Sequence, residues 1–343
     1  MLDKIFSKMD PIFETMGLLF VSYNLEEVKK ETKNTLSDLG FDGEQFYSQH
    51  LKTFDKYVQV FLKNRVECSE NKFFFGEKDS NYYLILLSLI IENRSWLTSF
   101  DCLSEDQVKS QIIHICKTIF EDETNTNSLD SLEDIIHYLD SSGLQSDAKW
   151  KMLRVMQSPK KYISNLIEII NSNVDAYRRA VSEVINPLEK LLNQYSVMET
   201  SNSDKKFYEL KATMTQSSVV YPTLIFPVSQ MLFEKSCYYG LLSERVIKSG
   251  KIRQNSKELL LIKLKALSDN SKLGIISSLK VSPKYNLEIA QQLGLTAATM
   301  SHHMNVLLNC GLVGVEKKNG KVYYHLEKEN LQDLIKELEE ALL

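Results

Sequence analysis

The spacing of apolar residues predicts α-helices through most of residues 1–212. Three stretches carry apolar residues at helical spacing: Phe54, Tyr57, Val58, Phe61 and Leu62; Val108, Ile112, Ile115, Cys116 and Ile119; Ile163, Leu166, Ile167 and Ile170. Breaks that contain glycine, proline or polar residues fall at 40–43, 121–127, 141–143 and 158–159. We therefore expect a mostly helical N-terminal domain, residues 1–247.

The pattern changes within residues 219–240, which read VVYPTLIFPVSQMLFEKSCYYG. Aromatic and β-branched side chains favour strands, and prolines suit strand ends or sheet edges. We expect a short β-hairpin here. Residues 248–257 are polar and basic and are interpreted as a linker to a second domain, residues 258–343.

The second domain begins with two predicted helices. Apolar residues indicate the first over 259–267, and Asp269 is expected to cap the second, which stops at Pro283.

A short helix, a tight turn and another helix follow. Asn286 is expected to cap the short helix and Gly294 to end it. Thr296 is expected to cap the next helix, which runs to about Asn309. These are the parts of a helix-turn-helix, whose second helix, the recognition helix, enters the major groove of DNA.

The predicted recognition helix has one apolar and one polar face. Its inward stripe is expected to be Met300, Met304, Leu307 and Leu308. Ser301, His302 and Asn305 fall on the opposite side, where short polar groups can reach base edges or phosphates. Ala297 in the first turn is small enough to let the helix approach the groove closely. His303 shares a face with the apolar stripe and is expected to flank the core.

A cationic hairpin is predicted directly after this helix. Asn319 and Gly320 separate two β-prone runs and suit a type I′ turn, which requires positive φ at both positions. Lys317, Lys318 and Lys321 surround that turn. Lysines at a hairpin tip can simply protect a strand edge. After a helix-turn-helix, however, they predict a wing that contacts phosphates or the minor groove.

Charge is distributed unevenly along the chain. The net charge is −4, yet residues 251–328 hold 12 lysines and arginines against 5 acidic residues. The rest of the chain holds 29 lysines and arginines against 40 acidic residues. A locally basic stretch in an acidic chain is typical of a phosphate-binding module. Double-stranded DNA is therefore the expected partner.

Composition narrows the other possibilities. The most apolar run, residues 82–91, is too short to cross a bilayer, and the start of the chain lacks the order of a signal peptide. The five cysteines have no metal or redox spacing, and the glycines form no phosphate-binding loop. We expect a cytoplasmic protein without a membrane contact, cofactor, metal site or catalytic residues.

Together these residues resemble the ArsR/SmtB transcription regulators. The resemblance covers roughly residues 258–330 and is carried by EIAQQLGLTAATMSHHMNVL at 288–307, GLV at 311–313 and GKVYYHL at 320–326. It implies a homodimer on an inverted-repeat operator, usually a repressor that an effector releases. It also implies DNA-reading roles for Thr296, Ala297, Thr299, Ser301 and His302, and places the wing tip at 317–321.

The chain departs from this family's pattern in two ways. Ala297 stands where a glutamine is frequent, which removes a candidate for adenine readout. The helix 287–293 has neither Cys nor His, and the terminal helix 329–343 has no His, so the family's usual metal sensing is not expected. That terminal helix builds the dimer in the family, and the matching apolar stripe here is Leu331, Leu334, Ile335, Leu338 and Leu342. The stripe can also pack within its own chain.

Two hypotheses for the whole protein follow. In the first, the N-terminal domain senses a small-molecule or protein effector, stabilises the dimer and biases operator binding. In the second, the chain is an enzyme or scaffold that uses the winged helix as a protein-interaction or dimerisation module. The basic balance of the winged helix favours the first.

Overall fold

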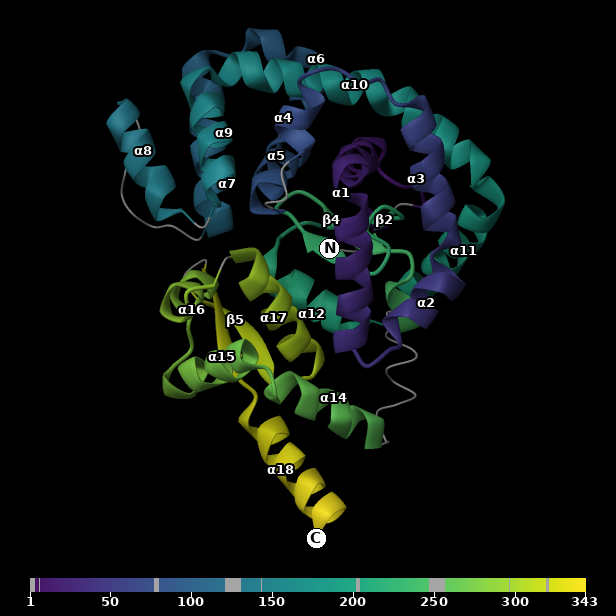
Figure 1. Cartoon of the computed structure of the whole chain (residues 1–343), viewed down its shortest axis with the longest axis vertical. Helices are drawn as coiled ribbons and strands as arrows, with labels where there is room; N and C mark the ends of the chain where they lie inside the picture. Colours follow the sequence, from purple (N-terminus) through teal and green to yellow (C-terminus); the bar gives the residue numbers. More distant parts are fainter. Residues whose placement is uncertain are drawn as a thin grey trace.

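The computed structural model describes residues 4–5, 7–76, 80–120, 131–142, 144–201, 204–246, 257–295, 297–318 and 321–343. We call residues 4–246 the N-terminal region and residues 257–343 the winged-helix module. The N-terminal region lies above the winged-helix module in Figure 1, and the last helix projects away from both. The expected linker lies, except for its last residue, outside the described residues.

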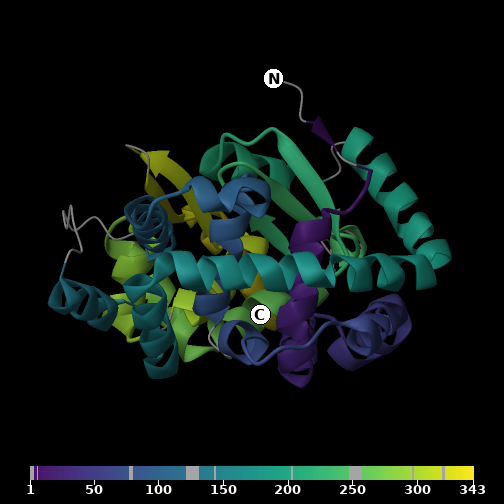
Figure 2. The same cartoon turned by 90° about the horizontal axis from the view of Figure 1, so that it is seen from above.

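The N-terminal region is mainly helical, as its apolar spacing predicts. Its helices are α1 (Pro11–Asp38), α2 (Gly43–His50), α3 (Lys52–Asn64), α4 (Asn71–Phe75), α5 (Ser80–Glu92), α6 (Trp96–Ser99), the 3-10 turn η1 (Phe100–Cys102), α7 (Glu105–Phe120), α8 (Leu132–Ser141), α9 (Ser146–Gln157), α10 (Pro159–Glu183), α11 (Ile185–Ser201) and α12 (Lys205–Met214). Seen from above, the long helix α10 crosses the region, as Figure 2 shows. It packs against α1 and α3.

A mixed sheet forms where a single hairpin was expected. Its strands are β1 (Lys4–Ile5), β2 (Val219–Thr223), β3 (Gln230–Leu232) and β4 (Cys237–Gly240). The order is β1-β2-β4-β3: β3 and β4 form the antiparallel hairpin, whereas β2 pairs in parallel with both β1 and β4. Pro222 fits inside β2 because β1 pairs only with Val219 and Val220.

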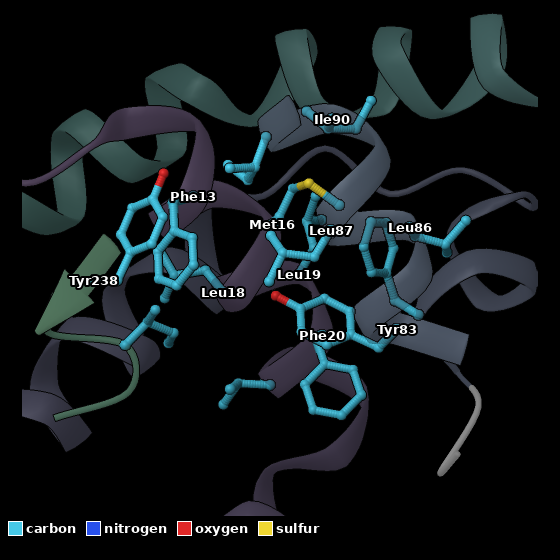
Figure 3. Close-up of a cluster of buried hydrophobic side chains, with 14 of the residues drawn as sticks. Phe13, Met16, Leu18, Leu19, Phe20, Tyr83, Leu86, Leu87, Ile90 and Tyr238 are labelled. Atoms are coloured by element: carbon cyan, nitrogen blue, oxygen red, sulfur yellow. The ribbon is translucent and has the colours of Figure 1, made fainter. Parts of the chain in front are cut away.

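Aromatic and aliphatic side chains from α1, α5, the sheet and the helices around them form the large core of the N-terminal region. The rings of Phe13 and Tyr238 stack 3.6 Å apart between α1 and β4, as Figure 3 shows. Asp10, the N-cap of α1, accepts a hydrogen bond of 2.7 Å from the Tyr238 hydroxyl and pairs with Arg94. The start of α1 is thereby fixed to the sheet by both apolar and polar contacts.

A fully buried carboxyl group lies one turn further along α1. Glu14 is 0% exposed and accepts four hydrogen bonds: from the hydroxyls of Tyr57 (2.8 Å) and Thr223 (2.6 Å), and from the backbone N–H groups of Leu224 (3.1 Å) and Ile225 (3.2 Å). All four partners are neutral. Burial therefore dominates and raises the pKa of Glu14 to about 7.

The winged-helix module contains α14 (Lys257–Leu267), α15 (Asn270–Val281), α16 (Asn286–Leu293), α17 (Ala297–Asn309), β5 (Val313–Lys318), β6 (Lys321–Leu326) and α18 (Lys328–Leu342). Asp269 caps α15 as expected, accepting the N–H of Lys272 at 2.9 Å. Asn286 is not the cap of α16 but its first residue. The N-cap is Tyr285 instead, and its backbone N–H donates a hydrogen bond of 3.2 Å to the Glu288 carboxylate.

The N-terminal region contacts the winged-helix module through several pairs of elements. α1 lies against α14, α5 against α17, and α12 against β5. At the first of these, the Lys265 ammonium donates to the Ser37 carbonyl at 3.0 Å and lies 3.8 Å from the Asp38 carboxylate. The Lys272 ammonium approaches the same carboxylate at 3.9 Å. The C-terminal end of α1 therefore carries an ionic contact with α14 and α15, which we call the α1 contact.

Candidate nucleic-acid interface

The turn between α16 and α17 is fixed by a glycine. Gly294 has φ of 66°, a left-handed conformation that most residues adopt only at a cost. The N–H of Leu295 then donates to the Ala290 carbonyl at 2.9 Å, which satisfies one of the last carbonyls of α16. The end of α16 is therefore determined by this local backbone geometry.

α17 has a buried apolar stripe. Met300, Met304 and Leu307 are each at most 1% exposed, and Leu308 is half-buried. Val306, which sequence reasoning left out of the stripe, is only 2% exposed. Helices and strands cover α17 on several sides, because α15, α16, β5 and α5 all contact it. This second covered side depends on neighbouring elements and not on the spacing of residues within α17.

The polar positions expected to read DNA lie on the same helix. Ala297, Thr299, Ser301 and His302 belong to the first half of α17, and Thr296 lies outside the described residues. Asn305 is exposed, on the side opposite the methionines. His303 is half-buried, in agreement with a position at the edge of the core.

The wing consists of β5 and β6, which pair antiparallel from Val313 with Leu326 to Lys318 with Lys321. Lys317 is exposed and lies beside that last pair, so all three expected lysines gather at one end of the hairpin. Asn319 and Gly320, which were expected to form the turn, lie outside the described residues. A basic tip of this kind is suited to contact with phosphates.

Some lysines of the basic stretch have a structural role instead. The Lys263 ammonium lies 3.3 Å from the Glu337 carboxylate and connects α14 to α18. Lys272 is 5% exposed and Lys265 belongs to the α1 contact. The excess positive charge available to a DNA backbone is therefore smaller than the sequence count indicates.

The apolar residues of α18 are divided between two surfaces. Leu334 is 1% exposed and belongs to the core of the winged-helix module, against which Leu331 and Leu338 are half-buried. Ile335 is 57% exposed and Leu342 is 78% exposed. The stripe therefore packs partly within its own chain and presents a second apolar side to the outside.

None of the helices that the structure describes is long and apolar enough to cross a membrane. Within the same described ranges, no three His, Cys, Asp or Glu residues are grouped so that they could hold a metal ion.

Comparisons with known proteins agree with the winged-helix module. The model of the bacterial regulatory proteins of the arsR family matches residues 269–315, from the cap of α15 into β5. An arsenical resistance operon repressor of Staphylococcus aureus is 35% identical over 82 residues, which are 24% of this chain and 78% of that repressor. No solved structure matches the chain.

A helix-turn-helix with a basic wing, in a chain similar to a known repressor, defines a DNA-binding transcription regulator. Through its winged-helix module, the chain belongs to the arsR family of bacterial regulatory proteins.

Proposed function

We propose that the protein is a repressor that binds an operator as a homodimer, in the cytoplasm, and that a non-metal signal received by its N-terminal region controls this binding. The observation that carries the proposal is α17, which buries its methionines and exposes Asn305 beside a wing with three lysines. Repression is proposed because the similar protein of Staphylococcus aureus is an operon repressor.

The dimer is proposed on the exposed side of α18. Ile335 and Leu342 leave an apolar surface on a helix that projects from the body of the protein in Figure 1. Leu261 of α14, the helix that packs against α18, is also 62% exposed. A two-fold interface that buries these side chains matches the symmetry of an inverted-repeat operator.

Control by the N-terminal region is proposed on its contacts with the DNA-binding elements. α5 contacts the recognition helix α17, and α12 contacts the wing strand β5. A ligand that binds the N-terminal region more tightly in one arrangement of these helices than in another would change operator affinity. α16, where the family's usual metal site would lie, contains neither Cys nor His, which favours an effector other than a metal ion.

A gel-shift titration with the DNA upstream of the protein's own gene tests the proposal. We expect sequence-selective binding that weakens steeply with salt, because phosphate contacts release counterions. His302→Ala should lower the affinity for this DNA. Lys318→Ala should make the slope of log affinity against log salt less steep by about 0.9, because one phosphate contact is lost. Lys190→Ala, an exposed lysine of α11, removes the same charge far from the wing and should leave both unchanged.

The alternative, an enzyme or scaffold with a protein-binding winged helix, predicts the opposite result. In that case no DNA sequence is preferred, and neither the His302 nor the Lys318 variant changes binding. The dimer is tested separately by sedimentation of Ile335→Asp, which should be monomeric at concentrations where the unmodified protein is dimeric. An unmodified protein that sediments as a monomer at micromolar concentration would refute the homodimer.

A further inference from the structure

Lys284 joins the base of the wing to the helix-turn-helix through its backbone. It lies between α15 and α16, where it forms an isolated β-bridge with Tyr324 of β6. The N–H of Lys284 donates to the Tyr324 carbonyl at 3.0 Å, and the N–H of Tyr324 donates back at 2.8 Å. The residue therefore acts as a short third strand beside β6 at the point where α16 is about to start.

The side chain of Lys284 extends this connection to two helices. Its ammonium donates to the Ser278 hydroxyl of α15 at 2.9 Å and to the Gln292 amide oxygen of α16 at 3.0 Å. The Ser278 hydroxyl, itself 3% exposed, donates to the same amide oxygen at 2.7 Å. The three groups form a closed triangle between α15, α16 and the bridge to the wing.

Gln292 connects the triangle to the C-terminal end of α16. Gln292 lies two residues before Gly294, whose left-handed backbone ends α16 just before the recognition helix α17. On the other side of the bridge, the ring of Tyr285 meets the ring of Tyr323 edge-on at 6.1 Å. The wing strand β6 and the end of α16 are therefore connected through one residue, Lys284, and its immediate neighbour.

We infer that Lys284 is a positioning residue for DNA binding, which holds the wing and the recognition helix at a fixed relative placement. The inference rests on the DNA binding proposed above. A wing and a helix that must contact one duplex together bind more tightly when their placement is set before binding. In this role the ammonium is used by Ser278 and Gln292 and does not contact a phosphate.

Lys284→Met tests the inference, because methionine keeps the length of the apolar stem and removes the ammonium. Ser278 still donates to Gln292 in this variant, so no buried polar group loses its partner. The probes are a duplex of about 30 base pairs, long enough for two half-sites, that the unmodified protein selects from a random pool, and a scrambled duplex of the same composition. We expect affinity for the selected duplex to fall about fivefold, the ratio that one average hydrogen bond is worth.

The salt dependence separates positioning from phosphate contact. For Lys284→Met we expect the slope of log affinity against log salt, and the affinity for the scrambled duplex, to remain as in the unmodified protein. A slope smaller by about 0.9 would show a phosphate contact and overturn the inference. Lys280→Met, an exposed lysine of the last turn of α15, is the matched control and should leave the ratio of the two affinities unchanged.

A second variant keeps the inference testable if Lys284→Met loses helical circular dichroism. Gln292→Leu should lower affinity for the selected duplex to a similar extent, and the double variant should lose no more than either single one, because the triangle acts as a unit. Losses that multiply, or a Gln292→Leu protein with full affinity, would overturn it. If the unmodified protein selects no duplex, the proposed function itself fails. If it selects one and Lys284→Met binds it normally, only the inference fails.

Discussion

Glu14 makes the stability of the N-terminal region depend on pH in an unusual direction. Burial raises its pKa to about 7, whereas the same carboxyl group titrates near 4.5 when exposed. Below about pH 4.5 the group is neutral in both the folded and the unfolded chain. Between pH 4.5 and 7 the unfolded chain releases its proton while the folded chain keeps it. The free energy of unfolding therefore falls as pH rises through this range.

The size of the effect follows from the two pKa values. One pKa unit corresponds to about 1.4 kcal/mol, so Glu14 alone should reduce the free energy of unfolding by about 2 to 3 kcal/mol between pH 5 and pH 8. Glu14→Gln removes the titration and keeps the shape of the side chain. Its amide nitrogen can donate to Tyr57 but opposes the N–H of Ile225, an orphaned donor that costs about 1 to 3 kcal/mol.

Urea unfolding followed by tryptophan fluorescence measures this effect, because Trp96 and Trp150 both belong to the N-terminal region. The quantity of interest is the difference in unfolding free energy between the unmodified protein and Glu14→Gln at each pH, in which other titrating groups cancel. We expect the unmodified protein to be more stable at pH 5 and to lose that advantage by pH 8. A difference that stays constant or grows with pH would show that the four donors outweigh burial and hold the carboxylate ionised.

Three further predictions concern the winged-helix module. Gly294→Ala should cost about 1 to 2 kcal/mol in the thermal stability of the module, because the positive φ disfavours a Cβ although space is open there; no loss would mean that the turn changes conformation. Met304→Ala should cost about 2 to 5 kcal/mol because it leaves a cavity in a core position that is 1% exposed, and calorimetry should show the loss. Asp38→Asn weakens the α1 contact and should increase the rate at which a protease cuts the chain between residues 246 and 257, while a lysine-neutralising change elsewhere on α14 should not.

The winged helix was predictable because its signals are local. A glycine between two short helices, a methionine stripe at helical spacing and a lysine-flanked hairpin turn each depend on neighbouring residues. The same reasoning placed Asn305 outside and Met304 inside, as the structure shows. It could not place Val306, since the elements that cover it come from other parts of the chain.

Features that depend on distant partners were not predictable from periodicity. The parallel pairing of β2 with β1 and β4 is one example. Residues 219–240 have the composition of strands, but composition does not indicate which strands pair with each other in the sheet. Glu14 is a single acidic residue within an apolar helix, and its four donors lie on α3, at the end of β2 and directly after β2. The role of Lys284 was missed for the same reason, because a lysine in a basic stretch is read as a surface charge.

The placement of β1 also determines when this protein can fold during synthesis. Lys4 pairs with Val219, so the sheet that closes the N-terminal region needs residues from both of its ends. A ribosome must therefore complete almost the whole region before its first strand finds its neighbour, and such non-local pairing is slow. The winged-helix module depends mainly on contacts between elements adjacent in sequence. It can fold soon after it emerges from the ribosome. We therefore expect the DNA-binding part to fold faster than the N-terminal region, although it is synthesised after that region.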